Sequence, residues 1–251
     1  MGKFIKKFTT HTEYEAAKSG LILPNVSLCA AEHEVHYNPW VTPQHEYVDL
    51  GLPSGTKWAT MNVGASSETD YGLYFQWGDT QGYTADQVGS GEGQKYFDWA
   101  DYKYSNNGGS SASDMTKYNS SDGLTTLQLS DDAAQAAWGD SWRMPTETQF
   151  NELLNSSYCT NVWTGITVGG TTVYGRLFTS KSNGNTLFFP AAGYCVNGSV
   201  SNVGSNGDYW SSSLYSSNVA RGRNLDFGSG GIGMDGYLRK SGFSVRGVVG
   251  Q

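Results

Sequence analysis

Histidine, cysteine and long apolar runs are scarce in this sequence, and each scarcity excludes a class of protein. All four histidines lie within the first 45 residues, so residues 46–251 lack the imidazole that Ser-His-Asp, Cys-His and most catalytic zinc sites require. The three cysteines show no C-x-x-C spacing, which excludes a disulfide framework and a structural zinc site, and we expect small buried thiols. No apolar run approaches the roughly 18 residues of a membrane-spanning helix.

Charge is also low, and its sign is acidic. Charged residues make up 16% of the chain and the net charge is −7, whereas a nucleic-acid groove needs clustered Lys and Arg. The last 44 residues carry five basic and three acidic groups, which we interpret as ordinary solvated charge. We therefore expect no nucleic-acid partner and no membrane insertion.

The N-terminus does not have the pattern of a signal peptide, because its lysines precede no apolar core of about 7–15 residues. Lys6 also departs from the myristoylation pattern that Gly2 would begin. We expect a protein that is made in the cytoplasm and either stays there or leaves the cell without the general secretion route.

Glycine and aromatic residues are abundant, with 33 Gly, 8 Trp, 16 Tyr and 10 Phe. This composition excludes a disordered chain and a coiled coil, and it is typical of a globular protein with an aromatic core and many tight turns. The length of 251 residues allows one sizeable domain and a short appendage. With Pro43 as a breaker, we predict a short docking or assembly segment over residues 1–45 and a main domain over residues 46–251.

Helix-capping patterns predict three short helices. Thr12 and Glu15 form a capping box, so we expect a helix from there to about Lys18. The run Ser130–Asp132 predicts the start of a second helix that ends at Gly139. Its two aspartates could be read as a catalytic pair, but capping of a first helical turn is the better interpretation.

The third predicted helix begins at Thr146, which forms a capping box with Gln149. Phe150, Leu153 and Leu154 follow at spacings of three and four residues, so they share one apolar face.

The remaining chain has strand and turn signals. We predict strands at 47–50, 57–61 and 72–77, and a polar surface loop over residues 105–122. From residue 160 onward the pattern is that of short strands with tight turns, so the predicted fold class is α+β with two helices in the main domain. The turn signals are Asn183-Gly184, Asn197-Gly198 and Asn206-Gly207.

Two short motifs carry little chemistry. Residues 228–233 match G-x-G-x-x-G, but too few residues follow for the helix and acidic residue of a dinucleotide site, so we reject that interpretation. His33 and His36 could bind a metal ion, although isolated surface histidines are the commoner case. We predict no cofactor and no metal site.

The most informative segment is 208–248, because it contains two stretches of strict alternation between apolar and polar residues, at 224–228 and 231–235. Leu225 and Phe227 face one way in one predicted strand, and Ile232 and Met234 do so in the next; Trp210 and Phe243 join them in the buried set. The solvent side mixes Gly with Asp and is flanked by Tyr and Arg, a composition typical of a binding surface. The ligand-binding residues predicted from this pattern are Tyr215, Arg221, Arg223, Asp226, Gly228, Gly231, Gly233, Asp235 and Tyr237.

Six motifs occur in order between about residues 46 and 248: Tyr47–Gly55, Trp58–Ala65, Tyr71–Gly78, Trp142–Thr146, Tyr209–Ser213 and Gly242–Arg246. In this order they resemble a C-type-lectin-like family of bacterial and phage proteins, which is related to the formylglycine-generating enzyme fold. The N-terminal stretch, with residues 11–15, 23–27 and 34–39, resembles the start of phage structural proteins from gut bacteria.

Within that family, residues 208–248 are similar to the variable regions of diversity-generating retroelements, which rewrite adenines, mostly in Asn codons. The resemblance adds Ser217 and Asn218 to the nine predicted binding residues, and it implies that all eleven are variable, since each can be reached from an Asn codon. Trp210, Met234 and Lys240 cannot be reached and are assigned to the scaffold.

The resemblance implies a non-enzymatic receptor-binding protein of a phage tail, or a related displayed adhesin, whose ligand is a surface protein or a glycan. Residues 1–45 would contact a virion or tail partner, and a homo-oligomer is compatible with this role. One alternative is a formylglycine-generating type of enzyme, although residues 208–251 lack its cysteine pair. Another is a structural virion subunit without a diversified site. The calcium motif of sugar-binding C-type lectins, Glu-Pro-Asn, is absent from the sequence.

Overall fold

The chain divides into two units, Met1–His45 and Glu46–Gln251, each of which is described by itself. The division falls where the sequence analysis places its boundary. The predicted helix that begins at Thr12 lies outside the described residues, as does His33. The computed structural model describes residues 5–7, 26–29 and 34–37 as strands, and residues 45–139 and 141–250 in full.

The described part of the N-terminal unit is one small antiparallel sheet. Its strand order is β1-β3-β2, and Lys6 lies opposite Val35 in the register. The strands are β1 (Ile5–Lys7), β2 (Val26–Cys29) and β3 (Glu34–Tyr37).

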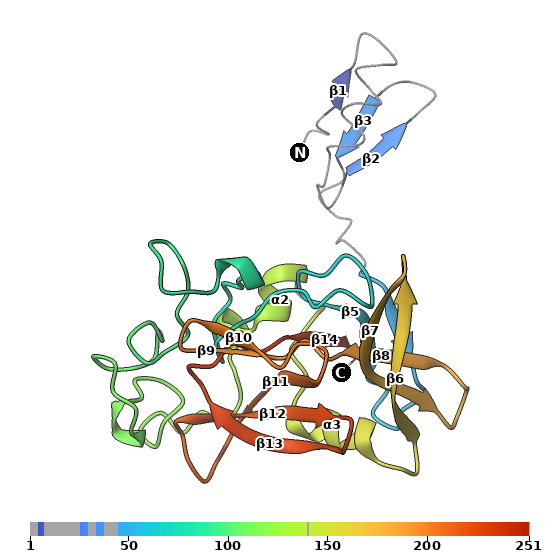
Figure 1. Cartoon of the computed structure of the whole chain (residues 1–251). Coiled ribbons are helices and arrows are strands. Elements are labelled where there is room, and N and C mark those ends of the chain that lie inside the picture. The colour runs from blue at the N-terminus through green and yellow to red at the C-terminus, as the bar shows by residue number, and fades with distance from the viewer. Residues whose placement is uncertain (1–4, 8–25, 30–33, 38–44, 140, 251) are drawn as a thin grey trace. The chain divides into compact units, whose positions relative to one another are not determined.

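The main unit is rich in strands, with two α-helices and several small antiparallel sheets among its described residues (Figure 1). This mixed architecture is the α+β class that the sequence predicts. Three sheets have three strands each, in the orders β14-β5-β4, β6-β7-β8 and β11-β12-β13, and β9 pairs with β10. The bounds are β4 Tyr47–Asp49, β5 Lys57–Asn62, β6 Cys159–Val168, β7 Thr171–Ser180, β8 Thr186–Pro190, β9 Tyr194–Val196, β10 Ser199–Ser201, β11 Asn206–Leu214, β12 Arg221–Gly228, β13 Ile232–Leu238 and β14 Arg246–Val249.

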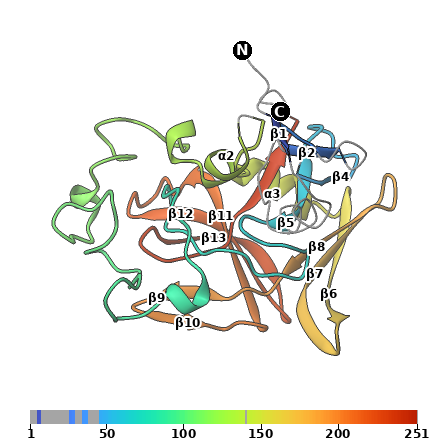
Figure 2. The same ribbon diagram turned by 90° about the horizontal axis from the view of Figure 1, so that it is seen from above.

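The first part of the main unit contains fewer strands than predicted. Residues 72–77 form only isolated bridges, between Tyr74 and Tyr83 and between Phe75 and Phe243. Most of residues 85–123 are loops with two 3-10 turns, and they lie on the opposite side of the unit from the β6–β7 hairpin (Figures 1 and 2). The predicted polar loop over residues 105–122 is not wholly at the surface, because Met115 and Tyr118 are buried in the core.

Both predicted helices of the main unit are present: α2 (Ala133–Trp138) and α3 (Glu147–Leu154). The capping box at the start of α3 is confirmed, with the hydroxyl of Thr146 accepting from the backbone N–H of Gln149. The predicted start of α2 is corrected: Asp132 is its N-cap, and the preceding residues form a 3-10 turn.

The hairpin turns were predicted with one error. Asn183-Gly184 lies between β7 and β8, and Asn197-Gly198 forms the two-residue turn between β9 and β10 with both residues at positive φ. The predicted turn at Asn206-Gly207 is wrong, because both residues belong to β11 and pair with β12. The turn lies just before them, where Asn202 and Gly204 adopt positive φ.

The core contains four clusters of buried residues, and the two largest lie on either side of the β11–β13 sheet. Trp210 stacks on Phe243 with ring centroids 4.1 Å apart on one side of the sheet. On the other side, Phe227 packs with Tyr209 in the second cluster, which also contains Trp58. The predicted burial of Trp210, Phe227 and Phe243 is confirmed, because each is fully buried.

Cys159 and Cys195 are free, buried thiols, as predicted. Burial raises the pKa of both, so both are held as neutral thiols. Among the described residues, no helix is long and apolar enough to cross a membrane.

Candidate functional site

The register of the β11–β13 sheet determines which side chains share a face. Leu225 lies opposite Met234 and Phe227 opposite Ile232, so these four side chains point to one side. Leu225 and Phe227 are fully buried against α3, whereas Ile232 and Met234 are only partly buried at the margin of the same cluster. The predicted apolar side of this hairpin is therefore confirmed, with its last two members less deeply buried than expected.

The opposite side of the sheet, here called the aspartate side, carries Asp226, Gly228, Gly233, Asp235 and Tyr237. Asp226 lies opposite Gly233, and the alternation along β12 and β13 places the other three on the same side. Asp235 is exposed and the other four are half-buried. The structure therefore brings these five predicted residues together.

Two polar residues on the aspartate side were not predicted: Asp208 and Asn224. Asp208 lies directly opposite Asp226 in the β11–β12 register and shares a hydrogen bond with it. Burial and the neighbouring charge of Asp226 raise the pKa of Asp208 to about 8, and burial also raises the pKa of Asp226. The two carboxyl groups therefore share a proton at neutral pH.

Asn224 is the third member of this polar group. Its Nδ2 donates to Asp208 Oδ1 at 3.2 Å, and the residue is 1% exposed. Its Oδ1 has no hydrogen-bond partner among the described residues. Tyr237 is on the same face of the sheet, and the centroid of its ring lies 5.3 Å from that of Phe243 and 6.2 Å from that of Tyr194.

Arg221 and Arg223 lie on the other face of the sheet, together with Leu225 and Phe227. The sequence analysis placed them beside the aspartates, which is wrong because residues 221, 223, 225 and 227 alternate in step along one regular strand. We call Arg221, Arg223 and Tyr215 the arginine side. It lies next to the N-terminal end of α3, which covers the apolar part of the same face.

Contacts hold each member of the arginine side in place. The Arg223 guanidinium lies 4.4 Å from the centroid of the Tyr215 ring, and its Nε forms an ion pair with Glu147 Oε1 at 3.1 Å. Arg221 Nη1 donates to the Gly236 carbonyl at 2.8 Å. All three predicted residues are half-buried, so each keeps part of its polar surface in solvent.

Ser217 and Asn218 lie in the loop between β11 and β12, and both are exposed. The loop is a compact turn: the Asn218 N–H donates to the Tyr215 carbonyl at 3.0 Å, and the Arg221 N–H donates to the Asn218 carbonyl at 2.9 Å. Ten of the eleven predicted residues therefore lie on the two faces of the sheet or in this loop, which joins the faces at one end. The eleventh, Gly231, is exposed in the turn between β12 and β13. β13 is an edge strand of the sheet (Figure 1).

Glycines in this segment divide into two kinds. A Cβ added at Gly231 or Gly233 would meet no atom within 4 Å, and one at Gly228 would first meet the Ser205 carbonyl oxygen at 3.3 Å. None of the three has a positive φ. Neither space nor backbone conformation therefore requires glycine at Gly231 and Gly233, whereas a side chain at Gly228 would have a tight contact with the backbone of Ser205. At Gly222, in contrast, a Cβ would lie 2.6 Å from Trp77 Cδ1.

A fully buried arginine supports the end of β13, and sequence reasoning missed its role. Arg239 is 0% exposed, and its Nε donates to the hydroxyl of Tyr102 at 2.7 Å. Its guanidinium also lies over the Trp77 ring, 4.8 Å from the centroid, and donates to the carbonyls of Val219 and Lys117. Arg239 thereby ties the β11–β12 loop, the residues after β13 and the loops of residues 99–118 into one frame.

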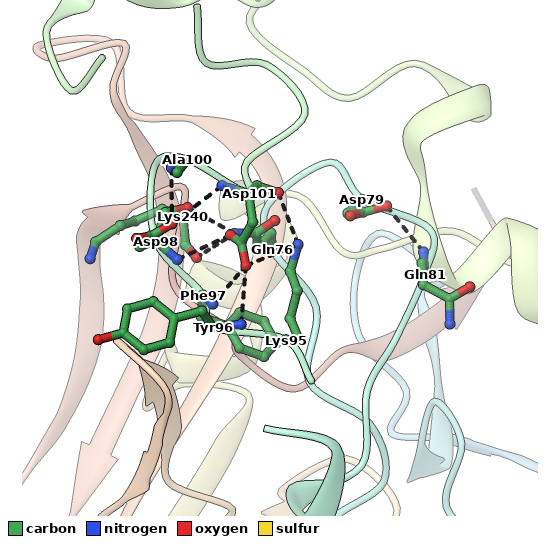
Figure 3. A network of polar contacts seen from close by, with 10 residues as sticks. All are labelled: Gln76, Asp79, Gln81, Lys95, Tyr96, Phe97, Asp98, Ala100, Asp101 and Lys240. Carbon is green, nitrogen blue, oxygen red and sulfur yellow. Dashed lines mark hydrogen bonds and ion pairs between the residues drawn. The ribbon is translucent and has the colours of Figure 1, made fainter. Parts of the chain in front are cut away.

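A second polar network fixes the residues that follow β13 (Figure 3). Gln76 Nε2 donates to the Lys240 carbonyl at 2.9 Å and to Asp101 Oδ1 at 2.8 Å. The same Asp101 carboxylate accepts from the backbone N–H groups of residues 96–98, where Phe97 adopts a φ of 60°. Lys240, which was predicted to belong to the scaffold, is indeed buried and donates to Asn197 Oδ1 at 2.6 Å.

Asp131 does not cap α2, so that interpretation of the sequence is corrected. Its buried carboxylate accepts hydrogen bonds from the hydroxyls of Tyr104 and Tyr118 and from Lys117 Nζ at 2.6 Å, with Lys103 Nζ at 3.3 Å. Burial alone would raise its pKa, but these hydrogen bonds lower the pKa to about 2. Each oxygen has its partners, which is the arrangement of a structural anchor for the 103–118 loop.

A metal site is not evident in the described part of the chain, where no three His, Cys, Asp or Glu side chains are placed to hold an ion. His33 lies outside the described residues, and for His36 only the backbone is described.

Comparison with known proteins finds one family match. Residues 176–248 match the family described as "Domain of unknown function (DUF8237)". The matched segment begins within β7 and ends within β14, so it contains the whole β11–β13 sheet. Neither the curated proteins nor the solved structures contain a match to this chain.

Proposed function

We propose that residues 46–251 form a C-type-lectin-like scaffold that displays a diversified ligand-binding surface. That surface consists of the aspartate side, the arginine side, the β11–β12 loop and Gly231 in the β12–β13 turn. The chain would serve as a receptor-binding protein of a phage tail or as a related displayed adhesin, with residues 1–45 contacting the virion or tail partner. It would bind without catalysing a reaction.

The observation that carries this proposal is the contrast between the two kinds of glycine. Gly231 and Gly233 occupy positions that would accept larger side chains, so their presence reflects no structural requirement. Gly222, on the same hairpin, is required because the Trp77 indole fills the space where its side chain would lie. A surface whose residues vary on a constant frame would have this division.

Burial supports the same division. None of the eleven predicted positions is buried, whereas the residues between them on β12 are all buried. Substitutions at the eleven positions would therefore change the surface chemistry and leave the packing of Leu225 and Phe227 intact.

The chemistry of the surface fits a polar macromolecular ligand. Tyr215, Tyr237 and the two arginines provide large amphipathic contacts, and Glu147 and the Gly236 carbonyl already orient the guanidinium groups. A ligand that spans the free edge of β13 would meet arginine donors on one face and carboxylate acceptors on the other. A surface protein and a glycan both present the complementary groups.

The enzymatic alternative has little support in the described residues. A formylglycine-generating mechanism needs a reactive cysteine pair, but Cys159 and Cys195 are unpaired and buried, with pKa values raised by burial. Neither belongs to the segment 208–251 in which that family carries its pair.

The experiment that tests the proposal compares two libraries of the full chain displayed on yeast. One randomises the codons of Tyr215, Arg221, Gly233 and Asp235, and the control library randomises exposed loop positions. Both are sorted against a panel of purified proteins and glycans. The control positions are Glu92, Asn106, Thr116 and Ser120.

We expect specific binders from the first library only, with surface display as high as for the parent chain. Equal recovery of binders from the two libraries would contradict the proposal, because the sheet surface would then have no special capacity. Loss of display throughout the first library would also contradict it, since the positions would then belong to the frame.

A further inference from the structure

The longest hairpin of the main unit carries an edge strand without the features that normally block strand pairing. β6 and β7 pair without interruption from Cys159↔Ser180 to Val168↔Thr171, and Gly169 and Gly170 form the turn at positive φ. β6 is the outer strand of its sheet. In the described part of the chain, residues 160–168 make no backbone hydrogen bond except with β7.

Natural edge strands are usually short, bulged, charged or covered, and the other edges of the main unit follow this rule among the described residues. β4 has three residues including Asp49, β8 ends in Pro190, and β13 carries Asp235. β14 is covered through a bridge from Arg143 to Val248. β6 has ten residues and contains no Pro, Lys or bulge.

The side chains of this hairpin add an uncharged aliphatic face. Val162 lies opposite Leu177 and Ile166 opposite Val173, so these side chains and Val168 point to one side of the ladder. Val162 is 53% exposed and Val168 is 58% exposed, and the other three are half-buried.

Charge is absent from the accessible part of the hairpin. Arg176 is the one charged residue between Cys159 and Ser180. It is 8% exposed and donates to Asn161 Oδ1 and to the Gly228 carbonyl. Two copies of a chain with a net charge of −7 can therefore approach through this hairpin without placing like charges in contact.

We propose that β6 pairs edge to edge with β6 of a second copy, in antiparallel orientation about a two-fold axis. The unpaired backbone groups of β6 are complementary to an extended strand, and antiparallel pairing of one edge with itself is self-complementary. The two β6–β7–β8 sheets then form one continuous sheet, and Val162, Ile166 and Val168 of both copies lie on its common aliphatic face. This inference does not rest on the proposed function of the β11–β13 sheet.

The test uses the full chain in analytical ultracentrifugation over a range of concentrations. We expect the wild-type protein to shift with concentration from 27.2 kDa to twice that mass. The double variant Val162→Lys/Val168→Lys should remain monomeric, because it places charges opposite one another across the shared edge. The matched control Val203→Lys changes a valine that is 44% exposed in a loop, and it should associate as the wild type does.

Amide hydrogen exchange of the wild-type protein provides a readout that does not depend on any variant. Residues 160–168 should become more protected as concentration rises. A monomer at every concentration would overturn the proposal. Slow exchange of these amides in that monomer would show that another segment of the same chain covers the edge. A dimer that persists in the double-lysine variant would also overturn it, since the interface would then lie elsewhere.

Discussion

Replacing Gly222 with alanine should destabilise the protein, whereas the same change at Gly233 should not. Both glycines lie in the β12–β13 hairpin and neither has a positive φ, so the two substitutions differ only in the space around the new Cβ. At Gly222 that Cβ would lie 2.6 Å from Trp77 Cδ1. The Trp77 ring is fully buried, and its Nε1 donates to the Ser211 carbonyl at 2.8 Å, so it cannot move without losing that hydrogen bond.

Overpacking of this kind typically lowers the free energy of unfolding by about 1–3 kcal/mol, and we expect about 2 kcal/mol for Gly222→Ala. Gly233→Ala should be neutral or stabilising by about 0.5 kcal/mol, because alanine reduces the entropy of the unfolded chain and meets no atom in the folded one. Urea unfolding of the full chain, followed by tryptophan fluorescence, measures both. Equal stability of the two variants would refute the distinction between open and required glycines.

Three further predictions concern the carboxylates and the core. The folded-state pKa of Asp208 is about 8, above its ordinary value of 3.8. The free energy of unfolding of the wild-type protein should therefore fall as pH rises between these two values. In urea unfolding, Asp208→Asn should be about 2 kcal/mol more stable than wild type at pH 8 and equal to it at pH 4. Asp131→Ala leaves Lys117 and two tyrosine hydroxyls without their acceptor and should lower the free energy of unfolding by about 3 kcal/mol. In thermal and urea unfolding, Phe227→Ala should cost about 4 kcal/mol, whereas the exposed Ser217→Ala should stay within about 0.5 kcal/mol of wild type.

The sequence predicted the elements that depend on residues close together in the chain. The capping box of Thr146 and Gln149 marks the start of α3 because both partners lie within one helical turn. The alternation around Leu225 and Phe227 predicts their burial because side chains in a strand alternate whatever its neighbours are.

Features that depend on distant partners could not be predicted in the same way. Asn206-Gly207 has the composition of a turn but lies in a strand, because Gly207 pairs with Phe227, whose ring fills the space above it. Asp131 precedes a helix but turns away to tyrosine and lysine side chains from a loop that the sequence presents as solvent-exposed.

The sequence predicted that the side chains of the candidate site are accessible, but it did not predict on which face of the sheet each one lies. Because side chains alternate along a strand, the sequence alone could have placed Arg221 and Arg223 with Leu225, on the opposite face from Asp226. Asp208 and Asn224 required knowledge of the β11–β12 register, which brings residues 16 apart in sequence into hydrogen-bond contact. The support from Arg239 likewise depends on loops far away in the chain.

The central claim is that the surface residues vary while the frame does not, and a comparison of DNA copies tests it most directly. The measurement is to sequence the locus around the gene, search for a near-copy of the segment that encodes residues 208–248, and align the two copies base by base. We predict differences almost solely at adenines, in the codons of the eleven surface positions, with the codons of Gly222, Leu225 and Phe227 unchanged. The absence of a second copy, or differences spread evenly over surface and buried codons, would contradict the account.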